Sequence, residues 1–284
     1  MKKIYLVLGI TIAIIIVFLI SYSNHPGKSN QNTTISKLSY VALGDSVAAG
    51  DGLQNYSDSS ACDRTNQSYP YLLATQHNFK LTNLSCSGAS LTSGIIGQQN
   101  VNNLLLASQL SQLFNLPKPS IISLTIGAND IGWINFIVQC YTSTCGSSND
   151  SLVVSQKIST MTSNLNTALS DIQNHYKINP PDVIVTGYYQ IFPNTISNCS
   201  DISGLNINEI NWVNQQQQNL NSAIENVVSN YTFAKFASIN FTGHELCTAS
   251  SWIQGINDSA PYHPNLLGQQ FYANQVYSTY KLFK

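Results

Sequence analysis

The chain has 284 residues, of which 43% are hydrophobic and only 9% are Asp, Glu, Lys or Arg, and its formal net charge is −1. With a single arginine, Arg64, and no excess of positive charge, the composition excludes nucleic-acid binding through a basic surface. The hydrophobic fraction excludes global disorder, which requires low hydrophobicity and high net charge. The length suits one domain of about 250 residues with additional segments.

The N-terminal segment predicts export. Lys2 and Lys3 precede an apolar run over residues 4–20. The run exceeds the apolar region of a signal peptide, about 7–15 residues, and reaches the lower limit for spanning a bilayer. We interpret residues 1–23 as a retained transmembrane signal anchor or, alternatively, a cleaved signal peptide, and the polar residues 24–37 as a tether. Both place the remaining chain outside the cell, anchored to the membrane or secreted.

Six cysteines in an exported chain predict three disulfides, with fifteen connectivities open. They are Cys62, Cys86, Cys140, Cys145, Cys199 and Cys247. The short separation between Cys140 and Cys145 favours that pair, and the absence of a C-x-x-C pair disfavours zinc. Nine N-x-S/T sequons, the first at Asn32 and the last at Asn257, suit an exported glycoprotein.

Short apolar runs alternate with longer segments of helical spacing. The runs that predict strands are 40–43, 121–126, 182–186, 233–239 and, more weakly, 79–84. The segments that predict helices are 69–77, 101–114, 151–176, 207–230 and 265–282. This alternation predicts one α/β domain over residues 38–284, with helices on both faces of a parallel sheet. Functional side chains are then expected at the carboxyl ends of the strands.

Two polar turns directly follow predicted strands. Ser46, in Gly44-Asp45-Ser46, stands at a strand-to-helix turn where its hydroxyl is lifted out of the sheet, although a helix N-cap is the alternative. Asn129, in the G-A-N-D sequence after the strand at 121–126, offers an amide donor to a developing oxyanion, or else forms an ordinary polar turn.

Two further positions complete the set of candidates. Gly88 follows the weak strand at 79–84, and its amide is either another oxyanion donor or part of a tight turn. His263 precedes Pro264 at a loop-to-helix boundary, where a general base is both rigid and exposed. A surface or N-cap histidine is the alternative at that position.

In this order, the four candidates resemble the SGNH family of the GDSL esterases and lipases. The closest resemblance is to its secreted, disulfide-containing branch of bacterial extracellular esterases. The shared motifs are a cysteine before N-x-SYP (62 and 66–70), C-S-G-A (86–89), T-I-G-x-N-D (125–130), G-H-x-x-C (243–247) and H-P-N-x-x-G (263–268). The likeness covers about residues 39–275, nearly all of the predicted domain.

The resemblance implies a flavodoxin-like three-layer α/β/α sandwich with a five-stranded parallel sheet, and ester hydrolysis without metal or cofactor. Ser46 would be the nucleophile and His263 the general base, with oxyanion donors from Ser46, Gly88 and Asn129. It also implies the disulfides Cys62–Cys86, Cys140–Cys145 and Cys199–Cys247.

The same resemblance also implies the substrate class and the binding partners. The substrate would be a small-molecule, lipid or acylated-sugar ester, the membrane contact would run through the N-terminal helix, and we expect a monomer. A catalytically inactive surface module of the same fold, binding glycans or lipids, is the alternative function.

One position departs from the family pattern. Many members carry an aspartate three residues before the histidine, where this chain has Ala260. We therefore expect the backbone carbonyl of Ala260 to orient the ring of His263. The nearest carboxylate upstream is Asp258, five residues before His263, and whether it contributes is open.

Overall fold

The computed structural model describes residues 37–54, 61–195 and 199–284. Residues Lys37–Lys284 form one compact unit. The predicted N-terminal helix, and all of the tether except Lys37, lie outside the described residues, so both remain predictions. Within the described part, no helix is both long and apolar enough to cross a bilayer.

Five parallel strands form the central sheet, in the order β2-β1-β5-β6-β7. Their bounds are β1 Ser39–Gly44, β2 Lys80–Asn83, β5 Ile121–Thr125, β6 Asp182–Thr186 and β7 Ala234–Ala237. Every residue of β5, and all of β1 except Ser39, is buried. Burial on both faces is why these strands are mostly apolar rather than alternating between apolar and polar residues.

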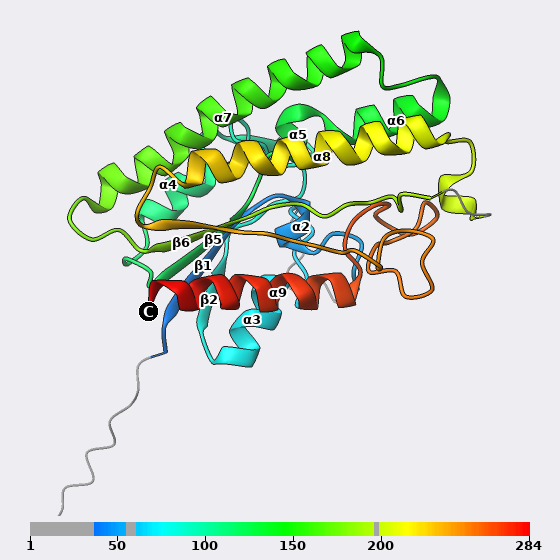
Figure 1. Cartoon of the computed structure of the whole chain (residues 1–284). Coiled ribbons are helices and arrows are strands. Elements are labelled where there is room, and N and C mark those ends of the chain that lie inside the picture. Colours follow the sequence, from blue (N-terminus) through cyan, green and yellow to red (C-terminus); the bar gives the residue numbers. More distant parts are fainter. Residues whose placement is uncertain (1–36, 55–60, 196–198) are drawn as a thin grey trace, which may run out of the picture. The chain divides into compact units, whose positions relative to one another are not determined.

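Helices cover both faces of this sheet and make the molecule a three-layer α/β/α fold (Figure 1). On one face lie α4 Gln109–Phe114, α5 Ala128–Ile131, α6 Trp133–Thr142, α7 Ser148–Tyr176 and α8 Ile207–Val228. On the other lie α3 Tyr69–His77 and α9 Leu266–Tyr280. The described residues also include the short helix α2 Ser46–Ala49 and the 3₁₀ turns η1 Ser200–Ile202 and η2 Lys281–Phe283. The predicted three-layer architecture with a five-stranded parallel sheet is confirmed.

The predicted helix over residues 101–114 is wrong in its first half. A small antiparallel hairpin of β3 (Gln99–Val101) and β4 (Leu104–Leu106) occupies that stretch, and helix α4 begins only at Gln109. Asn102 and Asn103 connect the two strands with positive φ angles of 50° and 65°. Asparagine tolerates this left-handed backbone well, which is why it favours two-residue hairpin turns.

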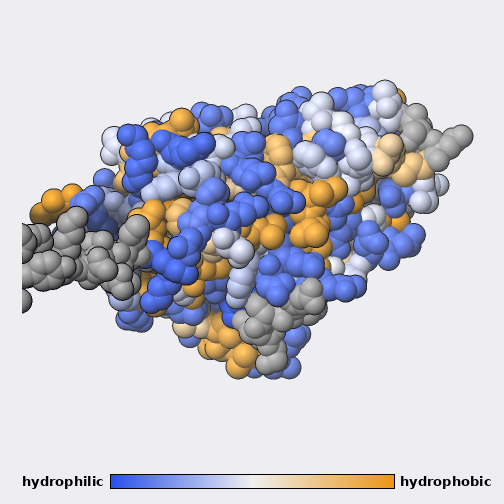
Figure 2. Space-filling model, turned by 90° about the horizontal axis from the view of Figure 1, so that it is seen from below, coloured by the Kyte–Doolittle hydropathy of each residue, from blue (hydrophilic) through white to orange (hydrophobic). Residues whose placement is uncertain are grey.

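The described surface is polar although few residues are charged. Figure 2 shows one face on which hydrophilic residues predominate and hydrophobic residues form separate patches. Since only 9% of the residues are charged, uncharged amide side chains supply much of that polar surface.

All six cysteines are paired as the family resemblance implied: Cys62 with Cys86, Cys140 with Cys145, and Cys199 with Cys247. The first and third pairs join segments that belong to different loops at the carboxyl edge of the sheet. The second closes the turn after α6. The disulfides therefore fasten loops, while the sheet itself is held by its buried core.

Candidate active site

The nucleophile candidate sits at a tightly constrained turn after β1. At Gly44 the φ angle is +139°, and a Cβ there would lie 2.4 Å from the carbonyl oxygen of Thr125, so only glycine fits. The buried side chain of Gln109 accepts from the Gly44 N–H at 2.8 Å and donates to its carbonyl at 2.9 Å. Ser46 then opens the short helix α2 and lines the pocket described below.

Asp45, directly before Ser46, is buried and caps α2. One carboxyl oxygen accepts from the Val47 N–H at 3.0 Å, and the other accepts from the Tyr188 hydroxyl at 2.5 Å. Burial raises the pKa of Asp45 from 3.8 to about 7, although both hydrogen bonds oppose that shift. The Tyr188 hydroxyl also accepts from the N–H of Ala128 at 3.2 Å. Tyr188 thus links the turn that carries Ser46 to the turn that carries Asn129.

The two oxyanion candidates, Gly88 and Asn129, come after β2 and β5, the two strands that flank β1 in the sheet. Gly88 has a φ angle of +77°, and Asn129 lies in the short helix α5. The side-chain amide of Asn129 donates to the carbonyl of Ala89 at 2.8 Å, which fixes its orientation beside Gly88. The carboxylate of Asp130 accepts from the Leu91 N–H at 3.0 Å, so both residues tie α5 to the loop after β2.

His263 reaches the nucleophile candidate from the far end of the chain. Its Nε2 lies 2.7 Å from Ser46 Oγ. Its Nδ1 lies 3.1 Å from the carbonyl oxygen of Pro261. A carbonyl only accepts, so this contact requires the proton on Nδ1 and leaves Nε2 free to accept from the Ser46 hydroxyl.

The carbonyl that faces the histidine ring belongs to Pro261, and our expectation of Ala260 is corrected. The Ala260 carbonyl instead accepts from the backbone N–H of His263 at 3.2 Å. Tyr262, between Pro261 and His263, adopts a φ of +67°. This backbone angle turns the chain so that the Pro261 carbonyl faces the histidine ring. Asp258 is not at the ring: its carboxylate accepts from the Gly255 N–H at 2.6 Å and closes a local turn.

The backbone around His263 is fixed by one distant residue, Tyr189, and by Gln254 in the same loop. The Tyr189 hydroxyl donates to the Tyr262 carbonyl at 2.6 Å. Gln254 pairs with both sides of the loop, donating its N–H to the His263 carbonyl at 2.8 Å and accepting from the Tyr262 N–H at 3.0 Å. The unusual backbone of Tyr262 is therefore held on both sides.

These residues surround one pocket of about 240 Å³. All four candidates line it, so the structure brings together Ser46, Gly88, Asn129 and His263. Apolar and aromatic side chains make up much of the remaining wall: Val47, Trp133, Ile134, Ile137, Tyr188, Tyr189 and Ile191. Such a lining with a few converging polar groups is typical of a site for an organic ligand.

Sequence reasoning missed three residues that support this site: Gln109, Tyr188 and Pro261. Tyr188 lies two residues after β6, so the rule that functional groups gather at the carboxyl ends of parallel strands would have found it. The side chain of Gln109 binds the backbone of Gly44, and Pro261 acts through its own carbonyl, and no sequence pattern predicts either contact.

Among the described residues, one group of a carboxylate and two sulfur atoms lies close enough together to hold a metal ion. It consists of Asp201 and the cysteines Cys199 and Cys247. Those two cysteines form a disulfide, so they offer no thiolate to a metal ion.

Comparison with known proteins decides the family. The model of the GDSL-like Lipase/Acylhydrolase family matches residues 42–271. The chain belongs to this family. Among its curated relatives is Lipase 1 of Streptomyces coelicolor, 29% identical over 241 residues that cover 81% of this chain and 82% of the relative. A lipase of Streptomyces rimosus is 28% identical over 243 residues, covering 83% and 84%.

Solved structures agree with this assignment. Phospholipase A1 from Streptomyces albidoflavus superposes with a TM-score of 0.68 at 28% identity, over 86% of this chain and all of that one. The extracellular lipase from Streptomyces rimosus gives a TM-score of 0.65 at 26% identity, over 85% and 99%. This GDSL-family chain is therefore a carboxylic ester hydrolase, which favours the enzyme over the inactive surface module.

Proposed function

We propose that this GDSL-family protein is an exported serine esterase or lipase that uses a Ser46–His263 dyad and an oxyanion hole. The observation that carries the proposal is the 2.7 Å contact between Ser46 Oγ and His263 Nε2, inside a pocket that Gly88 and Asn129 also line. A nucleophile and a base within hydrogen-bond distance, with the base oriented by a third group, are the signature of nucleophilic catalysis.

In the first step, Ser46 Oγ attacks the ester carbonyl and His263 Nε2 takes the hydroxyl proton. The carbonyl oxygen becomes an oxyanion, and the donors for it are the amides of Ser46 and Gly88 and the side chain of Asn129. Such fixed dipoles stabilise the transition state because they need no reorientation during the reaction.

In the second step, His263 returns the proton to the leaving alcohol, which departs and leaves an acyl group on Ser46. Water, activated by the same histidine, then releases the acid and restores the serine. The Pro261 carbonyl orients the imidazole but carries no full charge, so it stabilises the imidazolium less than a carboxylate does. Asp45, which faces Tyr188 and Val47, holds the turn rather than the ring.

Export is the second part of the proposal. Three disulfides suit an oxidising compartment, and the basic pair and apolar run at the N-terminus suit a signal anchor or signal peptide. One of the similar solved structures is that of an extracellular lipase. Residues 38–284 would then form the hydrolase domain outside the cell. A mature N-terminus near Met1 in the membrane fraction identifies an anchor, and one near Asn24 identifies a cleaved signal peptide.

Labelling with a fluorophosphonate tests the proposed nucleophile. We expect one label per chain on Ser46, none in Ser46→Ala, and much slower labelling in His263→Ala. Ser87→Ala is the matched control, because Ser87 lines the same pocket but its hydroxyl donates to Asp51 at 2.7 Å. Labelling that persists in Ser46→Ala would show that another residue is the nucleophile.

A further inference from the structure

A shallow apolar groove of about 470 Å³ adjoins the catalytic pocket. It shares one wall with the pocket, including Ile134 and His263. Beyond that wall the groove runs between α6 and the loop before His263, where Val138, Tyr141 and Ile256 line it. An apolar depression open to a reaction centre is a place where substrate can lie.

Helix α6 supplies one side of the groove as a regular stripe. Ile134, Val138 and Tyr141 are four and three residues apart, so they lie along one face of the helix. The side chains of Ile134 and Val138 are 48% and 49% exposed. On the opposite face Phe136 and Cys140 are buried in the core. Ile134 and Val138 are therefore not needed for packing the helix, whereas Tyr141 is half-buried, stacks on Tyr262 and donates to the Asp201 carbonyl.

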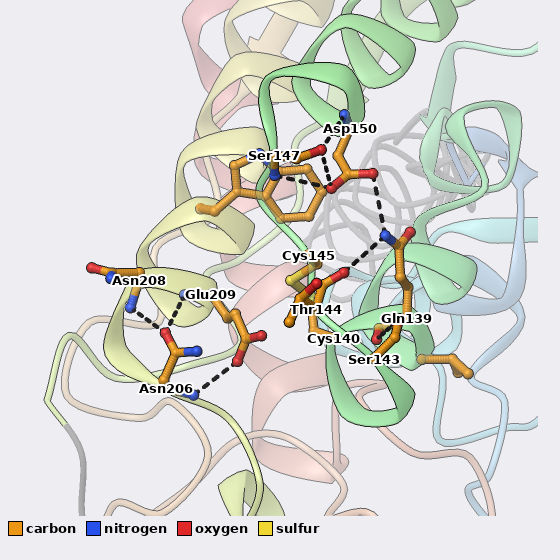
Figure 3. The surroundings of a disulfide bond; sticks show 12 residues. Gln139, Cys140, Ser143, Thr144, Cys145, Ser147, Asp150, Asn206, Asn208 and Glu209 are labelled. Atoms are coloured by element: carbon orange, nitrogen blue, oxygen red, sulfur yellow. Dashed lines mark hydrogen bonds between the residues drawn. A yellow bond between two sulfur atoms is a disulfide. The ribbon is translucent and has the colours of Figure 1, made fainter.

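The C-terminal end of α6 is fixed, which makes the groove a built surface. The Cys140–Cys145 disulfide closes the turn after the helix (Figure 3). The side-chain amide of Gln139 donates to the Thr144 carbonyl at 3.1 Å and to the Asp150 carboxylate at 3.2 Å. Asp150 is itself part of the capping box that begins α7.

The chemistry of the proposed reaction says which part of the substrate faces this groove. Of the four catalytic and oxyanion candidates, only His263 lines it. His263 must return a proton to the leaving oxygen, so the alcohol side of the ester lies next to its ring. The oxyanion donors line the pocket alone, so the acyl side belongs there.

The charges around the groove select among alcohols. Asp51 stands at the junction of groove and pocket, with its carboxylate accepting from Ser87. Neither Lys nor Arg lines the groove or the pocket within the part of the chain that the structure describes. A phosphate would meet a carboxylate and no cation, whereas a hydroxyl beside the ester finds an acceptor.

We infer that this groove is the binding site for the alcohol side of the ester. It takes an uncharged alcohol moiety that has a polar group near the ester and an apolar chain beyond it, as in a diacylglycerol. The inference rests on the proposed function, because it uses His263 as the group that protonates the leaving oxygen. Val138, Tyr141 and Ile256 are then the residues that determine specificity for the alcohol.

Two glycerides that differ only in the second chain test the inference. We expect wild-type protein to hydrolyse the outer ester of 1,2-dioctanoylglycerol with at least about a tenfold higher kcat/KM than 1-monooctanoylglycerol, below the micellar concentration of both. The expected ratio falls about tenfold in Val138→Asp, because a charge in the groove opposes the apolar chain. Leu152→Asp on α7 is the matched control: Leu152 is 56% exposed, lies outside the groove, and should keep the ratio within twofold.

The outcomes separate the groove from the dyad. Equal hydrolysis of both glycerides by the wild type, or an equal loss of both in Val138→Asp, overturns the groove while Ser46-dependent activity leaves the proposed function standing. Dioctanoylphosphatidylglycerol cleaved as fast as the diacylglycerol overturns the selection for an uncharged alcohol. If neither glyceride is hydrolysed, or Ser46→Ala hydrolyses them like the wild type, the proposed function fails and the groove assignment with it.

Discussion

Ser46 and His263 meet in one pocket, but different kinds of structure hold them. Ser46 follows an interior strand of the sheet, and its turn is fixed by Gly44, by the buried carboxyl of Asp45 and by side-chain hydrogen bonds. His263 lies in the irregular segment between β7 and α9, and its ring meets a backbone carbonyl, that of Pro261. The core of the domain thus positions the nucleophile, whereas the backbone of a loop positions the base. Substitutions around Ser46 and around His263 should therefore affect activity to different extents.

The largest effect is expected from removing Ser46 or His263, and it tests whether the two residues act in the same step. Ser46→Ala and His263→Ala should each lower kcat at least about a thousandfold, and the double variant should be scarcely worse, because residues that share a proton transfer are non-additive. Steady-state kinetics with a soluble octanoate ester measures this. Losses that multiply in the double variant would mean that the two residues do not share a step.

A smaller loss is expected on the oxyanion side. Asn129→Ala removes one proposed donor and should lower kcat about 10²–10³-fold with little change in KM, since one such donor is worth about 3–4 kcal/mol in the transition state. Asn164→Ala is a control, because Asn164 lies on α7 outside the catalytic pocket. An Asn129→Ala enzyme with unchanged kcat would remove the side chain from the mechanism.

The carboxyl groups of Asp45, which is buried, and of Asp130, which is half-buried, should make stability depend on pH. Burial raises the pKa of Asp45 to about 7 and that of Asp130 to about 6, both from 3.8. The folded chain therefore binds protons more tightly than the unfolded chain between about pH 4 and 7, and its unfolding free energy falls as pH rises through that window.

We accordingly expect a Tm several degrees higher at pH 5 than at pH 7.5, measured by circular dichroism. Asp45→Asn should shrink the difference, because that side chain no longer titrates. Asp258→Asn, at an exposed turn, should leave it unchanged. A Tm that rises between pH 5 and 7.5 contradicts the assignment of these two carboxyls.

The smallest effect concerns the histidine side. Asp258→Asn should keep kcat within about tenfold, because Asp258 closes a turn with Gly255 and the ring faces Pro261. In enzymes that use an aspartate in this role, the equivalent change costs about ten thousandfold. A loss approaching that size in a folded variant would make Asp258 the third member of the catalytic group.

Much of this architecture was predictable because it rests on local patterns. The strands at 40–43, 121–126, 182–186 and 233–239 are predominantly apolar runs, as is typical of buried parallel strands, and each appears in the sheet. The predicted helix at 69–77 has the bounds of α3. The hairpin at 99–106 was missed because its apolar residues also fit helical spacing, and the Asn102-Asn103 turn decides against the helix.

The sequence by itself determined the family, the disulfide pairs through that family, and the four candidates Ser46, Gly88, Asn129 and His263. Each of these four residues stands in a short sequence motif, and the motifs occur along the chain in the order typical of the family. Only the tertiary structure decided what surrounds them: the Pro261 carbonyl at the ring, Tyr188 against Asp45, and the groove along α6. These contacts join groups that come close only because of how the loops fold over the edge of the sheet. No local sequence pattern predicts that proximity.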